Sequence, residues 1–173
     1  ELYLEQLSSS IQVSDPWTQP SGTGVVTARN MTVGAARLTA LELNASGGME
    51  ELRFTASCDG SVESGTQPSS AVSCDAEGIL YPFKKQLALT TFKGTVGEFA
   101  YALADKALIS AQENALTVDP IALEVGEGRL FFQGRFSSQS LDSEFRVESF
   151  PVSLTRLFLT PAYTGKLDGQ IDL

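Results

Sequence analysis

Apolar and polar residues alternate with a period of two along most of this chain. Leu41, Leu43 and Ala45 occupy every second position of one segment, and Leu87 and Leu89 do so in another. Successive side chains of a β-strand point to opposite sides, so this alternation is typical of strands with one apolar face. The pattern recurs from end to end and predicts an all-β fold.

The alternating segments are short and are separated by residues that break strands. Asn30, the pair Gly47-Gly48 and the run 126–128 mark such breaks, and Pro120 separates the apolar positions of 116–118 from those that follow it. Gly, Asn and Pro are depleted in strands and favoured in turns. This spacing predicts about ten short strands joined by tight turns.

Two segments are also compatible with helix. In 151–159 a leading proline is followed by apolar residues at positions 154, 157 and 158, so we expect a short amphipathic helix there. The segment 98–107 is rich in Ala and Leu. Its residues Phe99, Tyr101 and Leu103 alternate, however, which favours a strand.

A pattern of apolar residue, any residue, Gly, any residue and apolar residue occurs three times, over 92–96, 132–136 and 167–171. Within a strand the central glycine shares a face with both apolar residues, and such a glycine marks a bend or a close approach by another group. Either these glycines lie on a bending apolar face, or the pattern recurs by chance in a Gly-rich β protein.

Cys58 and Cys74 are the only two cysteines. They bracket 59–73, which is rich in Ser and otherwise mostly Gly and polar residues, and which we interpret as a loop insertion between two strands. A disulfide between them would close a loop of about 15 residues, stabilise the fold by roughly 3 kcal/mol and indicate an oxidising compartment. The alternative is two unrelated reduced thiols.

Charge and hydropathy exclude two classes of partner. The chain has 12 Lys and Arg against 21 Asp and Glu, a formal net charge of −9. Such a surface repels nucleic-acid phosphates and anionic bilayers, so we expect no nucleic-acid partner. No run approaches the roughly 18 apolar residues of a membrane-spanning helix, so we expect no direct membrane span.

No catalytic or metal site is apparent. The chain has no His, which removes Ser-His-Asp arrangements and most zinc sites, so we expect neither an enzyme nor a metal or cofactor. Carboxylates such as Asp15 and Glu124 could pair for glycoside hydrolysis, but their positions fit solvated turns and strands. Trp17 either offers a stacking platform for carbohydrate or anchors a sheet edge.

From residue 92 onward the order of the motifs is similar to the C-terminal region of the TamB family, within the AsmA-like group of bacterial envelope proteins. The first Phe-x-Gly-x-Val pattern leads to an alternating run at 116–123 and then to GEGRLFFQGRF at 126–136. The sequence FPVSL at 150–154 and the ending YTGKLDGQIDL at 163–173 follow. Leucines within 35–43 resemble a recurring strand of the family, so the resemblance extends from about residue 24. The two cysteines and their insertion depart from it.

This resemblance implies that residues 1–173 are one β-rich segment of a longer periplasmic protein, anchored in the inner membrane of a Gram-negative bacterium. Both ends of the chain, which starts without Met and stops inside an alternating run, fit that expectation. The implied fold is an elongated, curled (taco-like) sheet with an apolar concave face. The implied function is phospholipid transport toward the outer membrane, with a TamA-like outer-membrane barrel-assembly protein as partner.

In this interpretation the apolar strand faces line a groove for phospholipid acyl chains, and each methylene group removed from water contributes about 0.8 kcal/mol. The expected lining residues are Leu41, Leu43, Leu87, Leu89, Leu123, Leu130, Phe132, Phe136, Phe145 and Val147. The alternative is that the same residues form the core of a closed β-sandwich, a binding or adhesion module for a carbohydrate or protein ligand.

Overall fold

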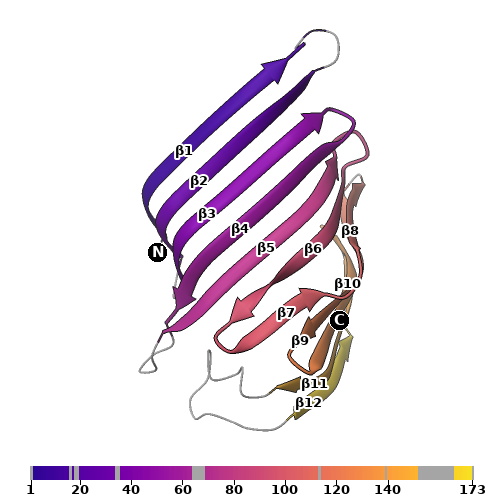
Figure 1. The fold of residues 1–173 in the computed structure, drawn as a ribbon. Helices are drawn as coiled ribbons and strands as arrows, with labels where there is room; N and C mark the ends of the chain where they lie inside the picture. Colours follow the sequence, from indigo (N-terminus) through magenta and orange to yellow (C-terminus); the bar gives the residue numbers. More distant parts are fainter. Residues whose placement is uncertain are drawn as a thin grey trace.

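The computed structural model describes residues 2–15, 17, 20–33, 36–63, 69–112, 114–138, 140–151 and 166–172. These residues form one antiparallel sheet of twelve strands and no helix, which confirms the all-β prediction (Figure 1). The strands are β1 (Leu2–Ser14), β2 (Ser21–Val33), β3 (Ala36–Gly48), β4 (Leu52–Val62), β5 (Ser70–Tyr81), β6 (Gln86–Val96), β7 (Phe99–Leu103), β8 (Ala107–Gln112), β9 (Ala115–Val125), β10 (Gly128–Ser137), β11 (Leu141–Pro151) and β12 (Lys166–Asp172).

Strand order in the sheet follows chain order from β1 to β12, with one exception at β7 and β8. The C-terminal half of β6 pairs with β7, and its N-terminal half pairs with β8. Both short strands then pair with β9 on their other side. Together β7 and β8 therefore fill a single strand position, with the chain leaving the ladder between Leu103 and Ala107.

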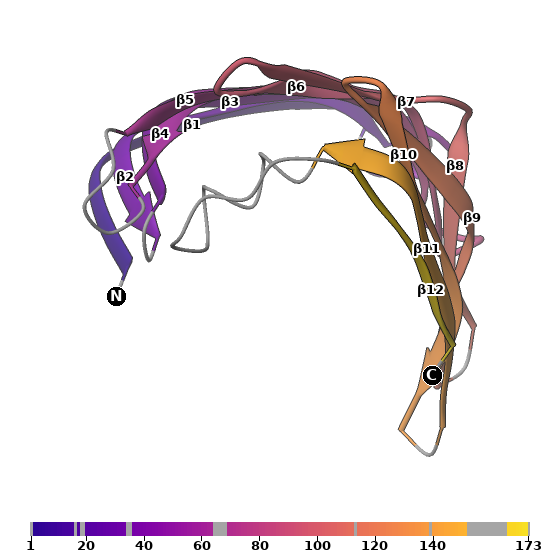
Figure 2. The same cartoon turned by 90° about the horizontal axis from the view of Figure 1, so that it is seen from below.

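The sheet is not flat. Figure 2 shows it bent, with β1–β6 in one limb and β10–β12 in another, and with β7 and β8 near the bend. Extensive contacts join only strands that are neighbours in the sheet. The described part of the chain is therefore a single layer, without a second sheet or a helix packed on it.

Bulges interrupt the ladders without ending the strands. Pro120 lies inside β9, where the register with β10 shifts between Phe132 and Gly134, so the expected break at this proline is wrong. Asn30 in β2 and Ser149 in β11 have positive φ angles of 50° and 48°. A strand can carry a bulge and continue, which is why these strands are longer than the spacing of turn residues predicts.

Three local predictions have different outcomes. The segment 98–107 is β7 followed by the start of β8, so the preference for strand is confirmed. Of the helix expected over 151–159, Pro151 belongs to β11 and pairs with Lys166, and the remainder lies outside the described residues. The loop insertion predicted over 59–73 is shorter than expected, because β4 continues to Val62 and β5 begins at Ser70.

Candidate binding face

The strand register collects most of the apolar positions of the twelve strands on one side of the sheet. Directly paired residues of antiparallel strands point to the same side, so the pairs carry a face from strand to strand. The row from Leu41 through Cys58, Cys74, Gly94 and Tyr101 crosses five strands in this way. We call this side the apolar face.

Its apolar members lie at every second position outside the bulges. In β1–β6 they are Leu4, Leu7, Ile11, Val13, Val26, Ala28, Met31, Ala36, Leu38, Leu41, Leu43, Ala45, Leu52, Phe54, Ala56, Val62, Val72, Ala76, Leu80, Leu87, Leu89, Phe92 and Val96. In β7–β12 they are Phe99, Tyr101, Leu103, Ala107, Ile109, Ala111, Leu116, Val118, Ile121, Leu123, Val125, Leu130, Phe132, Phe136, Leu141, Phe145, Val147, Phe150 and Ile171. No Asp, Glu, Lys or Arg occupies a paired position on this face within the described strands.

The opposite side is mostly polar. In β4 the residues Arg53, Thr55, Ser57 and Asp59 are exposed, whereas the residues between them on the apolar face are half-buried. Alternation of this kind is expected of an antiparallel sheet with one side in water and the other side covered. Here no described element covers the apolar side.

The apolar face is accordingly crowded but open. Five of the six buried apolar residues lie on it, namely Ala28, Ala107, Val118, Val125 and Val147. No large side chain among the described residues is fully buried, and Leu43 and Phe145 each retain 38% of their surface exposed. Soluble proteins rarely expose continuous apolar surfaces larger than a few hundred Å² unless the surface binds something.

All ten expected lining residues lie on this face. Leu41 and Leu43 are on β3, Leu87 and Leu89 on β6, and Leu123 on β9. The other five are on the neighbouring strands β10 and β11, where Leu130 pairs with Val147 and Phe132 pairs with Phe145. The ten residues are thus spread over both limbs of the sheet rather than gathered at one point.

Sequence reasoning missed a large part of the same face. The four apolar side chains of β1 at positions 4, 7, 11 and 13 belong to it, as do Phe54 on β4 and Leu103 on β7. The period-two signal was present in these segments. In β1 the register with β2 is constant, but Glu5 and Asn30 are not among the paired residues, and the apolar positions Leu4 and Leu7 are three residues apart, so strict alternation is lost there.

Aromatic rings fill the space above two of the glycines on this face. A Cβ added at Gly78 would lie 2.7 Å from Cε1 of Phe54, and one at Gly94 would lie 2.6 Å from the hydroxyl oxygen of Tyr101. Phe92 packs against Tyr101 with 5.3 Å between ring centroids. These glycines therefore admit rings from the neighbouring strands and do not leave open channels.

Cys58 and Cys74 are directly opposite each other on β4 and β5, in the middle of the apolar face. Both are free thiols here, and the Cys58 thiol donates a hydrogen bond to the Cys74 sulfur over 2.8 Å. Burial, and then the contact with Cys74, raises the pKa of Cys58 to about 12. The pair lies inside the two strands rather than at the strand–loop junctions expected from the sequence.

Tyr101 is the next polar group along this row. Its hydroxyl donates a hydrogen bond to the carbonyl oxygen of Ser73 over 3.0 Å. Burial, followed by the nearby thiols of Cys74 and Cys58, raises its pKa to about 12. Cys58 and Tyr101 therefore stay uncharged at neutral pH.

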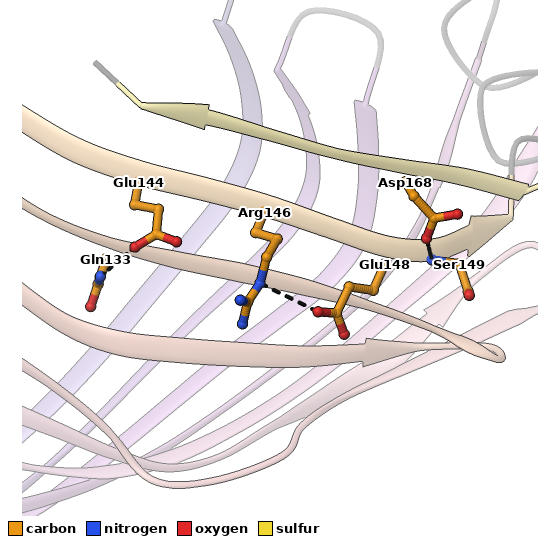
Figure 3. Close-up of polar contacts among 6 residues, drawn as sticks. All are labelled: Gln133, Glu144, Arg146, Glu148, Ser149 and Asp168. Carbon is orange, nitrogen blue, oxygen red and sulfur yellow. Dashed lines mark hydrogen bonds and ion pairs between the residues drawn. The ribbon is translucent and has the colours of Figure 1, made fainter.

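The polar side of β10–β12 carries a set of paired side chains (Figure 3). The Gln133 amide donates to Glu144 over 2.6 Å, and the Arg146 guanidinium lies 3.4 Å from Glu148 and 4.3 Å from the ring centroid of Phe131. The backbone N–H of Ser149 donates to Asp168 across the bulge. The Arg146–Glu148 pair lies along β11, and the other contacts join neighbouring strands. Strand pairing and bulge capping explain them.

Surface ion pairs elsewhere have the same character. Lys166 at the start of β12 donates to Glu127 in the turn between β9 and β10 over 3.0 Å, and this hydrogen bond lowers the pKa of the Glu127 carboxyl. Arg129 binds Glu124 over 3.0 Å. Exposed pairs of this kind contribute little stability.

Trp17 lies in the turn between β1 and β2, and 94% of its surface is exposed. Phe83 lies in the turn between β5 and β6 and is 71% exposed. Both therefore project from an end of the sheet rather than from either of its faces.

Within the described ranges, no group of three or more His, Cys, Asp and Glu side chains is arranged to hold a metal ion. The same ranges contain no helix long and apolar enough to cross a membrane. No protein-family model, curated protein or solved structure matches this chain. The candidate site is therefore defined by the geometry of the apolar face alone.

Proposed function

We propose that the apolar face binds the acyl chains of phospholipids, and that the chain is a segment of a lipid conduit. The observation that carries the proposal is the one-sidedness of the whole sheet. Apolar side chains occupy one face through twelve strands, without a charged residue at a paired position and without a covering layer in the described residues. A molecule that covers such a face must itself be apolar.

An acyl chain fits this surface chemically. Binding needs no specific polar contact, because each methylene group transferred from water contributes about 0.8 kcal/mol. A surface lined by Leu, Ile, Val and Phe side chains offers an acyl chain several equivalent binding paths across neighbouring strands. The proposed activity is passive binding and guidance, without covalent chemistry.

The apolar face is proposed to be the inner, concave side of the bend, which gives the taco-like form. Burial on this side supports it, since Val118, Val125 and Val147 are buried although no second layer covers them. Side chains on the inside of a bent sheet approach one another, whereas those on the outside spread apart. The exposed polar residues of β4 on the other side agree with that arrangement.

The wider setting follows from the resemblance to the TamB family within the AsmA-like group. In that setting the chain is the periplasmic portion of an inner-membrane-anchored envelope protein that supports outer-membrane biogenesis. The edge strand β1 offers thirteen residues with no neighbour on its outer side among the described residues. Such an edge can pair with a strand of a TamA-like partner by β-augmentation.

The alternative, a closed β-sandwich that binds carbohydrate or protein, requires two sheets facing each other. The described strands belong to one sheet, and extensive contacts join only its neighbours. Lipid binding therefore accounts for more of the architecture than the sandwich module does.

Native mass spectrometry of the protein with phosphatidylethanolamine tests the proposal. The folded protein is expected to retain phospholipid, and Leu43→Gln is expected to weaken retention severalfold, because Leu43 is a partly exposed member of the apolar face. Val25→Gln is the matched control. Val25 is 39% exposed, close to the 38% of Leu43, but it lies on the opposite side of the sheet, on β2. Its replacement should therefore leave retention unchanged.

Each variant is first checked for folding by circular dichroism. Failure of the folded wild-type protein to retain any phospholipid would contradict the proposal. Equal losses in the Leu43 and Val25 variants would contradict the assignment of the face.

A further inference from the structure

Three hairpin turns at one end of the sheet carry large apolar residues. Strands β1, β3 and β5 run in the same direction, so their following turns lie at the same end, as Figure 1 shows. Trp17, Met49 and Phe83 occupy these three turns and are exposed by 94%, 49% and 71%. We call these three side chains the tip row.

The three turns are also close in space. A hollow of about 610 Å³ is lined by Asp15 and Pro20 from the first turn, by Met49 and Glu51 from the second, and by Phe83 from the third. Met49 and Phe83 therefore line one hollow together with residues of the turn that carries Trp17, so the three turns form one surface feature.

The described residues between strands at the other end of the sheet are different. They are Glu63 and Ser69 between β4 and β5, Gly97 and Glu98 after β6, and Gly126 and Glu127 after β9, and all six are exposed. None of them is apolar apart from glycine. A Trp, Met or Phe side chain exposed in a turn gains little from packing within the fold, so three of them in adjoining turns point to a binding role for the tip row.

We propose that the tip row docks the sheet on a phospholipid membrane, inserting into the interfacial layer so that the apolar face opens onto the bilayer. The choice of a lipid surface rests on the function proposed above, because the tip row lies at one end of the apolar face. Trp is enriched at the level of lipid headgroups, and apolar side chains beside it reach the acyl boundary.

Charges beside the tips fit a zwitterionic surface. Lys84 and Lys85 follow Phe83, and Glu50 and Glu51 follow Met49, so both signs flank the apolar side chains. The net charge of −9 works against strongly anionic membranes. Phosphatidylcholine vesicles are therefore the appropriate probe.

The chain contains a single Trp, so its fluorescence reports on the tip row directly. On addition of phosphatidylcholine vesicles, we expect the emission of Trp17 to shift to the blue and to be quenched by brominated acyl chains. The double variant Met49→Ser with Phe83→Ser is expected to weaken vesicle partition about tenfold or more, since two apolar anchors are removed.

Tyr3→Ser is the matched control. Tyr3 is 60% exposed but lies on β1 away from the tip row, where it pairs with Thr32. Its replacement should leave partition unchanged. The inference is overturned if folded protein shows no vesicle-induced change in Trp17 emission, or if the Tyr3 variant loses as much partition as the double variant.

The two proposals fail separately. Retention of phospholipid in native mass spectrometry without vesicle docking would overturn the tip-row inference and leave lipid binding by the apolar face in place. Vesicle docking that depends on Met49 and Phe83, without retained lipid, would support the docking inference and overturn the proposed function.

Discussion

On the apolar face, some glycines leave space that aromatic rings of neighbouring strands occupy, and others do not. Gly94 and Gly169 are both the central glycine of the apolar-x-Gly-x-apolar pattern, on β6 and β12. A Cβ at Gly94 would collide with the Ser73 carbonyl oxygen and with the Tyr101 ring, whereas a Cβ at Gly169 would meet nothing within 4 Å. The two positions form a matched pair for mutation.

Gly94→Ala is expected to destabilise the fold by about 1–3 kcal/mol, because overfilling a packed site forces its neighbours to move. Gly169→Ala should be neutral or slightly stabilising, since alanine restricts the unfolded chain and meets no obstacle. Urea denaturation of both variants measures the difference. Equal destabilisation by the two substitutions would show that the ring of Tyr101 does not occupy the space above Gly94.

The sequence pattern predicts correctly that Gly94 and Gly134 share a face with their apolar neighbours. It does not predict which side chain fills the space, because Gly94 meets Tyr101 only through the register of β6 with β7. The same limit applies to Phe54 above Gly78 on the next strand. Interstrand contacts of this kind depend on register, which a single sequence does not encode locally.

At the scale of elements, the two cysteines lie side by side on adjacent strands. Directly opposite residues of an antiparallel ladder have Cα atoms about 4.5 or 5.5 Å apart, and both separations lie within the range of disulfides. Cys58 and Cys74 occupy such opposite positions on β4 and β5. The predicted disulfide therefore remains a prediction that the strand pairing favours.

Treatment with oxidised glutathione is expected to join the two cysteines, with loss of two hydrogen atoms from the protein and release of two reduced glutathione molecules. The cross-link should raise the free energy of unfolding by about 3 kcal/mol, and Cys58→Ser should remove this gain. Because burial raises the pKa of Cys58 to about 12, its thiolate fraction grows as the pH rises. Oxidation should therefore accelerate between neutral and alkaline pH.

Mass spectrometry and thiol titration measure the outcome. Two free thiols that persist in folded protein after prolonged oxidation at alkaline pH would rule the disulfide out. In either case the 59–73 segment is not a loop throughout, because residues 59–62 belong to β4 and residues 70–73 belong to β5.

Elements were predictable where alternation is regular and were missed where a bulge or a split occurs. The strand at β3 follows directly from Leu41, Leu43 and Ala45. Pro120 suggests a strand end, yet β9 passes through it, because a register shift with β10 accommodates the proline. The division of one strand position between β7 and β8 depends on pairing with β6 and β9 and has no local signal.

At the scale of the whole molecule, two properties could not be obtained from the sequence. The sequence pattern of an apolar strand face is the same whether the face is packed in a closed core or left open. Only the structure shows that the described strands form a single layer. The tip row also required the structure, because Trp17, Met49 and Phe83 are far apart in the chain and only the antiparallel order places their turns together.

The central claim is that lipid acyl chains cover the apolar face and avoid the opposite face. Site-specific photocrosslinking tests it most directly, with a photoreactive amino acid placed at Leu43 or Phe145 on the apolar face and at Thr55 or Asp75 on the polar side. All four positions are exposed. The claim predicts phospholipid adducts at the first two positions and none at the last two. Folded protein that forms no lipid adduct at Leu43 or Phe145, or forms as many at Thr55 and Asp75, would contradict it.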